Sequence, residues 1–399
     1  MAKSLWKPPQ LHSSKDNEKE RHATWLELFY DLVFVVAIAE LAHNLERDTS
    51  LSGFFGFVFL FVPIWWCWVG TTFYATRFDT DDLGHRLFAL LQMAIVAALA
   101  VNVHHGLEES SGGFALAYAA SRSVLIFQYL FAGYHVTAAR PLTTWYATGF
   151  SISAALWIVS VFVPVPWRFA LWGVGLIVDF TTPLTAGRLV ARIPPSMSHV
   201  PERIGLFTII VLGESIVAVV SGVAEQKWDV SSVLAAILGL SIAFSLWWIY
   251  FDTVDGSPLR GMKAGRMGIS LMWLYAHLPL GIGLTATGVG VEYMVSTKTG
   301  TILPDSTRWL FCGSVALCLS VLALIHLITC TLGTTRRRKI LSAYRLGSAA
   351  FILVLAVAGS QLPPVFLVGL VAVACIIQVV IDLLGNRPGI EAGSEIIQE

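Results

Sequence analysis

Long apolar segments alternate with short polar ones along almost the whole chain. Each apolar segment has about twenty residues, the length that an α-helix needs to cross a hydrocarbon core of about 30 Å. Strict alternation of apolar and polar residues is missing from these segments, so a membrane β-barrel is not favoured. The pattern predicts an all-α, polytopic integral membrane protein whose immediate partner is the lipid bilayer.

Polar and helix-breaking residues divide this pattern into about twelve expected transmembrane helices. The first six are expected over residues 23–45, 52–76, 86–106, 113–138, 143–163 and 167–187. The second six are expected over residues 204–223, 231–251, 266–290, 308–332, 345–361 and 364–384. We interpret residues 1–22 as a short disordered cytoplasmic tail, residues 188–203 as a cytoplasmic linker and residues 385–399 as a second cytoplasmic tail.

The composition agrees with a membrane location. Only 13% of the 399 residues are charged and 56% are hydrophobic, whereas about a quarter of a soluble protein is charged. The formal net charge is zero, which argues against a nucleic-acid partner. The five cysteines all lie in apolar segments and form no CxxC pair. We therefore expect them to be packing residues rather than disulfides or metal ligands.

Lysine and arginine predict the orientation of the helices. With a cytoplasmic N-terminus, 20 of the 26 Lys and Arg residues fall in cytoplasmic segments and five in outside segments, while Arg122 lies inside an expected helix. Short cytoplasmic loops of membrane proteins carry such an excess of positive charge. An even number of helices returns the C-terminus to the cytoplasm. Both termini are therefore expected there.

The two halves of the chain share several short patterns. Phe78–Asp82 and Phe251–Asp255 both read F-D-T-x-D at the end of the second helix of a six-helix unit. Glu202-Arg203 precedes the seventh helix as Glu20-Arg21 precedes the first. Six helices per copy start both halves on the same side of the membrane. The pattern therefore predicts two parallel repeats, at 23–187 and 204–384, related by an axis along the membrane normal.

Several ionisable residues lie within expected helices, where burying a charge costs about 2.5–3.5 kcal/mol. Asp31, Glu214, Asp179 and Arg122 are expected near mid-membrane, and Glu27 lies four residues before Asp31 on the same helix face. Two close carboxylates in a medium of low dielectric constant can share a proton. We interpret the set as an ion- or substrate-binding site. The alternative is that Arg122 neutralises Asp31 or Asp179 and ties helices together.

The F-D-T-x-D segments place acidic side chains at cytoplasmic helix ends. Asp79, Asp82, Asp252 and Asp255 could form a cytoplasmic gate. Alternatively, they pair with nearby basic residues and set the turn. The sequence leaves both interpretations open.

The sequence shows no motif typical of nucleotide binding, cofactor binding, nucleophilic catalysis or metal binding. No nucleotide-binding motif, dinucleotide fingerprint, nucleophile motif or close metal-ligand spacing occurs in a suitable setting. The expected loops are too short for a soluble catalytic domain. We expect no cofactor, no metal and no enzymatic activity.

Three segments resemble motifs of a known family. They are Glu27–Ile38, Arg77–Asp82 and Glu202–Glu214. Through them, the chain resembles the bacterial low-temperature-requirement A family. The resemblance implies a multi-pass protein of the bacterial inner membrane and brings no established substrate or reaction. The family's motif carboxylates match Glu27, Asp31, Asp79, Asp82 and Glu214. The physical reading of the sequence singles out the same residues.

The buried charges favour a secondary transporter or an ion- or proton-conducting permease for a small ion or solute. Two alternatives stay open. One is a non-catalytic membrane component needed for growth in the cold. The other is a membrane-embedded enzyme that acts on a lipid or a quinone.

Overall fold

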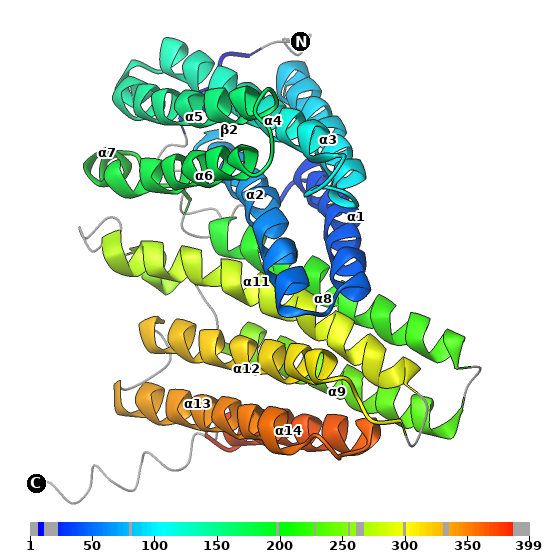
Figure 1. Ribbon diagram of the computed structural model, residues 1–399. Coiled ribbons are helices and arrows are strands. Elements are labelled where there is room, and N and C mark those ends of the chain that lie inside the picture. The colour runs from blue at the N-terminus through cyan, green and yellow to red at the C-terminus, as the bar shows by residue number, and fades with distance from the viewer. Residues whose placement is uncertain are drawn as a thin grey trace, which may run out of the picture. The chain divides into compact units, whose positions relative to one another are not determined.

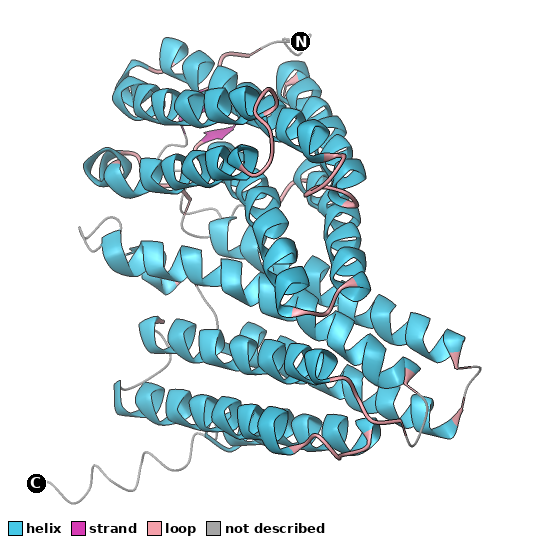
Figure 2. Cartoon of the chain, viewed as in Figure 1, coloured by secondary structure: helices cyan, strands magenta, loops and turns pink. Residues whose placement is uncertain are grey.

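The computed structural model describes residues 7–11, 23–79, 82–196, 199–226, 229–253, 256–260, 267–297, 301–329 and 335–385. Figure 2 shows that helix dominates these residues. Ten of their helices are long and apolar enough to cross a membrane. The protein is therefore a polytopic, helical membrane protein.

The helices of the first half are α1 to α7, with a 3-10 turn, η2, before α5. They span Trp25–Arg47, Leu51–Ala75, Leu83–Val103, Ser111–His135, Arg140–Ser160, Trp167–Thr185 and Gly187–Arg192, and η2 spans Thr137–Ala139. The helices of the second half are α8, α9, α11, α12, α13 and α14, with a 3-10 turn, η3, after α9. They span His199–Glu225, Val230–Thr253, Met267–Ser296, Asp305–Ile328, Thr335–Ala358 and Pro364–Gly385, and η3 spans Ser257–Leu259.

Each of the twelve expected ranges falls on one long helix. The largest shift is at α13, which begins at Thr335 instead of residue 345 because the basic segment Arg336–Lys339 is helical too. α1 and α6 are not among the ten helices that are long and apolar enough to cross a membrane, and each carries a buried carboxylate, Asp31 in α1 and Asp179 in α6. Twelve crossings and two repeats therefore stay predictions.

The chain forms two compact units. The first contains residues 1–214 and 256–285, and the second contains residues 215–255 and 286–399. The division falls inside α8 and α11, so each of these helices contributes to both units. All the sites described in the next subsection lie within one unit or the other.

In the first unit, neighbouring helices of the chain pack side by side. α4 packs against α3 and α5, α5 packs against α6, and α1 packs against α2 and α3 (Figure 1). The side chains of Trp65, Trp66 and Trp68 on α2 are all buried. These large rings make α2 a central element of the unit, because aromatic side chains bury the largest apolar areas.

The N-terminal segment departs from the expected disordered tail. Gln10–Leu11 forms strand β1, which pairs antiparallel with β2 at Phe78–Asp79. The backbone N–H of Lys7 also donates to the Asp82 carboxylate over 2.9 Å. The prediction of disorder is therefore wrong for residues 7–11, since the segment after α2 offers them backbone and carboxylate partners.

In the second unit, α12 packs against α13, and α9 packs against α14. Small residues allow close approach: a Cβ placed on Gly239 of α9 would lie 2.4 Å from Val291 of α11. Such contacts are typical of membrane helices, whose association depends on tight packing.

Candidate functional site

Asp31 of α1 is held in a closed ion pair in the first unit. The Arg203 guanidinium donates from Nε to Oδ2 over 2.9 Å and from Nη2 to Oδ1 over 2.6 Å. The Trp68 indole of α2 donates to Oδ1 over 2.7 Å. All three side chains are buried. This two-pronged geometry is the strong form of an arginine–carboxylate pair.

Glu27 extends this network by one helical turn. Its Oε1 lies 3.1 Å from Nη1 of Arg203 and 3.0 Å from Nε2 of His199. Its Oε2 accepts from the backbone N–H of Thr24 over 2.8 Å, while Thr24 caps the first turn of α1 in return. Because Glu27 and Asp31 are four residues apart, one arginine reaches both. We call Glu27, Asp31, His199, Arg203 and Trp68 the α1–α8 network.

Arg203 and His199 are the partners that the sequence did not indicate. The seventh expected helix began at residue 204, which left Arg203 at the membrane surface. The structure begins α8 at His199, so Arg203 lies one turn inside the helix, facing α1. A cation directly before a long apolar segment was the available signal.

Asp179 of α6 lies in a second polar cluster. Its Oδ2 accepts from the Tyr118 hydroxyl over 2.5 Å and from the Ser153 hydroxyl over 2.7 Å. Its Oδ1 has no hydrogen-bond partner in the described part of the chain. These contacts join α4, α5 and α6.

Arg122 of α4 is fully buried near Asp179. None of its three guanidinium nitrogens has an oxygen or nitrogen acceptor among the described residues, and its neighbours include the Cys67 thiol. The guanidinium carbon lies 5.1 Å from the ring centre of Tyr118 and 5.6 Å from that of Phe150. Cation–π contacts of this kind contribute about 2 kcal/mol or more when desolvated, whereas burying an unpaired charge costs several kcal/mol.

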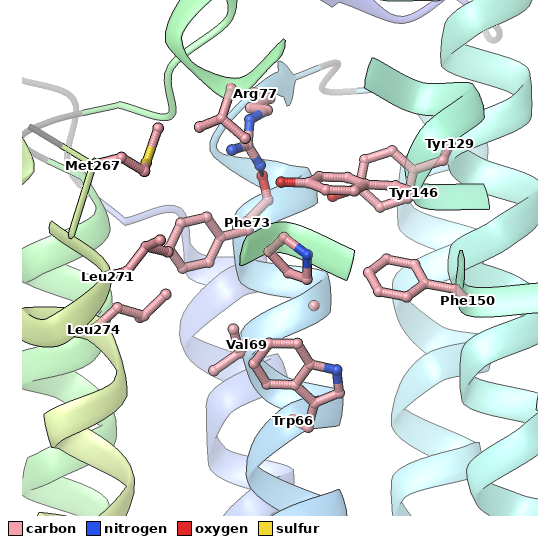
Figure 3. Close-up of a pocket in the computed structure, with 13 residues that line it drawn as sticks. Trp66, Val69, Phe73, Arg77, Tyr129, Tyr146, Phe150, Met267, Leu271 and Leu274 are labelled. Carbon is pink, nitrogen blue, oxygen red and sulfur yellow. Dashed lines mark hydrogen bonds between the residues drawn. The ribbon is translucent and has the colours of Figure 1, made fainter. Parts of the chain in front are cut away.

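A cavity lies next to Arg122, inside the first unit, and leaves about 40 Å³ open to the centres of water-sized molecules. Residues of α2 form one wall: Trp66, Val69, Gly70, Phe73 and, just beyond the helix, Arg77. Figure 3 shows Arg77 at one end and Trp66 at the other. Met267, Leu271 and Leu274 of α11 line one side, and Tyr129, Tyr146 and Phe150 of α4 and α5 line the opposite side.

Gly70 connects Arg122 to this cavity. A Cβ placed on Gly70 would lie 3.1 Å from Nη1 of Arg122, so the guanidinium lies directly against a residue of the wall. Phe150, the other contact of the guanidinium, lines the cavity as well. The only wall side chain with a formal charge, among those described, is Arg77. It is 2% exposed and donates to the carbonyl groups of Ile193 and Phe73.

The structure brings together some of the expected site residues and not others. It joins Glu27 to Asp31, and it places Arg122 near Asp179. Among the described residues, no hydrogen bond or ion pair connects Asp31 with Arg122 or Asp179. Glu214 is half-buried in α8 and belongs to neither group. The single expected cluster is thus two separate groups on different faces of α2.

The expected gate residues have various surroundings. Asp82 caps α3 by accepting from the His85 backbone N–H over 3.0 Å, in line with the turn-setting alternative. Asp252 is exposed at the end of α9. Asp79 lies in β2, with its side chain outside the described parts. Asp255 lies outside the described residues.

A third ionic group lies in the second unit. Arg345 of α13 donates to the Asp382 carboxylate of α14 over 2.9 Å and contacts His326 of α12. All three side chains are buried. The group ties three helices together, and the sequence analysis did not single it out. No set of three His, Cys, Asp or Glu side chains in the described residues is placed to hold a metal ion.

The family model described as "Bacterial low temperature requirement A protein (LtrA)" matches residues 22–380. The chain belongs to the bacterial low temperature requirement A family. It is also 28% identical over 305 residues to an uncharacterized protein of Rhizobium meliloti (strain 1021), which covers 71% of this chain and 72% of the relative. No solved structure matches the chain.

In this member of the low temperature requirement A family, the motif carboxylates Glu27 and Asp31 face the motif arginine Arg203. The resemblance found in the sequence is therefore confirmed as family membership, and the geometry gives those motifs a physical role. They join α1 to α8.

Proposed function

We propose that this protein is a secondary transporter or an ion-conducting permease of the bacterial inner membrane, with its solute site in the cavity of the first unit. The observation that carries the proposal is the position of the cavity. It extends along α2 from Arg77 to Trp66 and has the buried Arg122 against its wall.

The predicted topology supports this proposal. Residues at or near the C-terminal ends of α2, α4 and α6 and near the N-terminal ends of α5 and α11 line the cavity. In the proposed topology, with both termini cytoplasmic, all five of these ends face the cytoplasm. The cavity would then open inward, as the binding site of a transporter does in one of its two states.

The proposal changes the roles of the expected site residues. Arg122 and Asp179 would act at the deep end of the cavity, and Arg77 would lie at its mouth. Asp31 and Glu27 would keep α1 against α8 without contacting solute. No contact supports a role for Glu214 in this site. No chemical reaction is part of the proposal.

The α1–α8 network favours a second candidate function. Its carboxylates are buried and paired, which is typical of ionic groups that fix helix packing. If no solute crosses, the protein would be a non-catalytic membrane component that depends on this packing.

Flux through proteoliposomes tests the first function. Purified protein would be reconstituted, and proton flux would be read with an entrapped pH dye under a potassium diffusion potential. Currents evoked by inorganic ions, organic acids and amines would be recorded on a supported membrane. We expect flux above that of protein-free liposomes for at least one probe, and its loss in Arg122→Gln. Folded protein that gives no flux with any probe would favour the second function.

A further inference from the structure

Hydrogen-bond donors without an oxygen or nitrogen acceptor lie at and beside the deep end of the cavity, together with one unpartnered acceptor, Oδ1 of Asp179. Besides the guanidinium of Arg122, the indole Nε1 of Trp66 is buried and has no partner among the described residues. Trp66 lines the cavity. Buried donors without acceptors are costly, with about 1–3 kcal/mol for each neutral group and more for a charged one. A ligand that accepts hydrogen bonds would remove this cost.

The charged side chains at the cavity also favour an occupant that accepts hydrogen bonds. Arg77 lines the cavity and makes its hydrogen bonds to neutral carbonyl groups. Among the described residues, neither Arg77 nor Arg122 has a carboxylate within ion-pair distance. Asp179 acts on Arg122 only through space, and its Oδ2 already accepts from Tyr118 and Ser153. Two buried cations along one cavity favour a negatively charged occupant.

The rest of the wall is apolar. Phe73 and Phe150 offer aromatic rings, and Leu271 and Leu274 offer aliphatic surface. Gly70 lies five residues before the end of α2 at Ala75, which corresponds to about 7.5 Å along a helix, and Arg77 lies just beyond that end. An occupant can therefore place an acidic group near Arg122 and an apolar body against the rings, while Arg77 attracts it to the mouth.

We infer that the cavity binds a monovalent organic anion with an aromatic or branched apolar body, its acidic group accepting from Arg122 and Trp66. This names the substrate class of the permease proposed above and rests on that proposal. A small inorganic anion would leave the apolar wall unused. A neutral apolar molecule would leave the donors of Arg122 and Trp66 unpaired.

Equilibrium binding to the purified full-length protein tests the inference. The probe is benzenesulfonate, which stays ionised, and its matched control is methyl phenyl sulfone, which has nearly the same shape and no charge. We expect one saturable site for benzenesulfonate and binding of the sulfone at least about tenfold weaker, a difference of about 1.4 kcal/mol. Equal binding of the two compounds would overturn the inference.

Substitutions at Arg122 and Trp66 test whether benzenesulfonate binds at these two residues. Arg122→Gln is expected to weaken benzenesulfonate binding about tenfold, and Arg122→Lys, which keeps the charge, less. Trp66→Phe keeps a ring and removes one donor, so it provides a test if Arg122→Gln does not fold. Gly173→Ala is the control, since a Cβ there meets nothing within 4 Å. Unchanged binding in folded Arg122→Gln, or in Trp66→Phe if that is the variant that folds, would overturn the assignment.

An anionic lipid could supply the same chemistry, so binding would also be measured in nanodiscs. We expect equal affinity in phosphatidylcholine and in phosphatidylglycerol discs. Loss of binding with phosphatidylglycerol would assign the site to a lipid headgroup and overturn the inference. Binding without any flux would contradict only the transport proposal, whereas proton flux without anion binding would contradict only this inference.

Discussion

Arg203 of α8 donates hydrogen bonds to both carboxylate oxygens of Asp31 of α1, over 2.9 Å and 2.6 Å, although the two residues are 172 positions apart in the chain. The Trp68 indole completes the shell around the carboxylate. This pair and the Glu27–Arg203 contact join α1 to α8 within the first unit. Each guanidinium nitrogen of Arg203 has a carboxylate partner, two on Asp31 and one on Glu27, so the pair has a structural role.

Asp31→Asn should therefore destabilise the protein. The change leaves the Arg203 guanidinium buried with only Glu27 as an anionic partner, and breaking a buried pair costs about 3–5 kcal/mol. Unfolding in detergent micelles, followed by circular dichroism, would measure the loss. The double variant Asp31→Asn with Arg203→Gln should recover part of it. A double variant that is as unstable as the sum of the single ones would contradict a direct pair.

Gly70→Ala should disturb Arg122. The added Cβ would lie 2.8 Å from Leu125 and 3.1 Å from Nη1 of Arg122, and overpacking of this kind costs about 1–3 kcal/mol. We expect lower thermal stability and weaker benzenesulfonate binding. Gly173→Ala, in open space, should change neither property by a comparable amount. Equal effects of the two substitutions would contradict the close contact.

Asp179→Asn should strengthen anion binding. The asparagine carbonyl can still accept from Tyr118 or Ser153, while the negative charge that competes for Arg122 is gone. Benzenesulfonate affinity is expected to rise by about three- to tenfold, since about 1.4 kcal/mol corresponds to a tenfold change. Isothermal titration calorimetry would measure it. A weaker affinity in the folded variant would mean that Asp179 orients Arg122 towards the ligand.

Alkaline phosphatase fusions would test the proposed topology. The enzyme is active only outside the cytoplasm, so fusions after Thr49 and after Gln226 should be active and fusions after Ser196 and after Gly385 inactive. The fusion after Thr49 reports whether α1 crosses the membrane. The fusions after Ser196 and Gln226 report whether α6 crosses it. Inactive fusions after Thr49 would contradict a crossing by α1.

Hydrophobic length was enough to locate the helices, because a membrane requires about twenty apolar residues for each crossing. It was not enough to find their ends. Arg203 was placed outside α8, and Arg336–Lys339 outside α13, because a charge in the sequence is ambiguous between a loop and a helix end. The helical bounds His199 and Thr335 resolve that ambiguity.

Burial cost singled out Asp31, Glu27, Asp179 and Arg122, and all four are buried. Their partners depend on tertiary packing. Arg203 reaches Asp31 only because α8 lies against α1, and no local spacing indicates this. The cavity could not be predicted from the sequence either. Residues such as Phe73 and Leu271 have the pattern of ordinary core positions, and they line a space only because of how several helices pack.

We propose that solute passes through the cavity of the first unit. The most direct test of this proposal is the uptake of radiolabelled benzenesulfonate into proteoliposomes by wild type, Val69→Trp and Phe55→Trp. Val69 lines the cavity, whereas the side chain of Phe55 on the same helix is 60% exposed. We predict that Val69→Trp abolishes uptake while Phe55→Trp keeps it. Equal uptake by the two folded variants would contradict passage through the cavity.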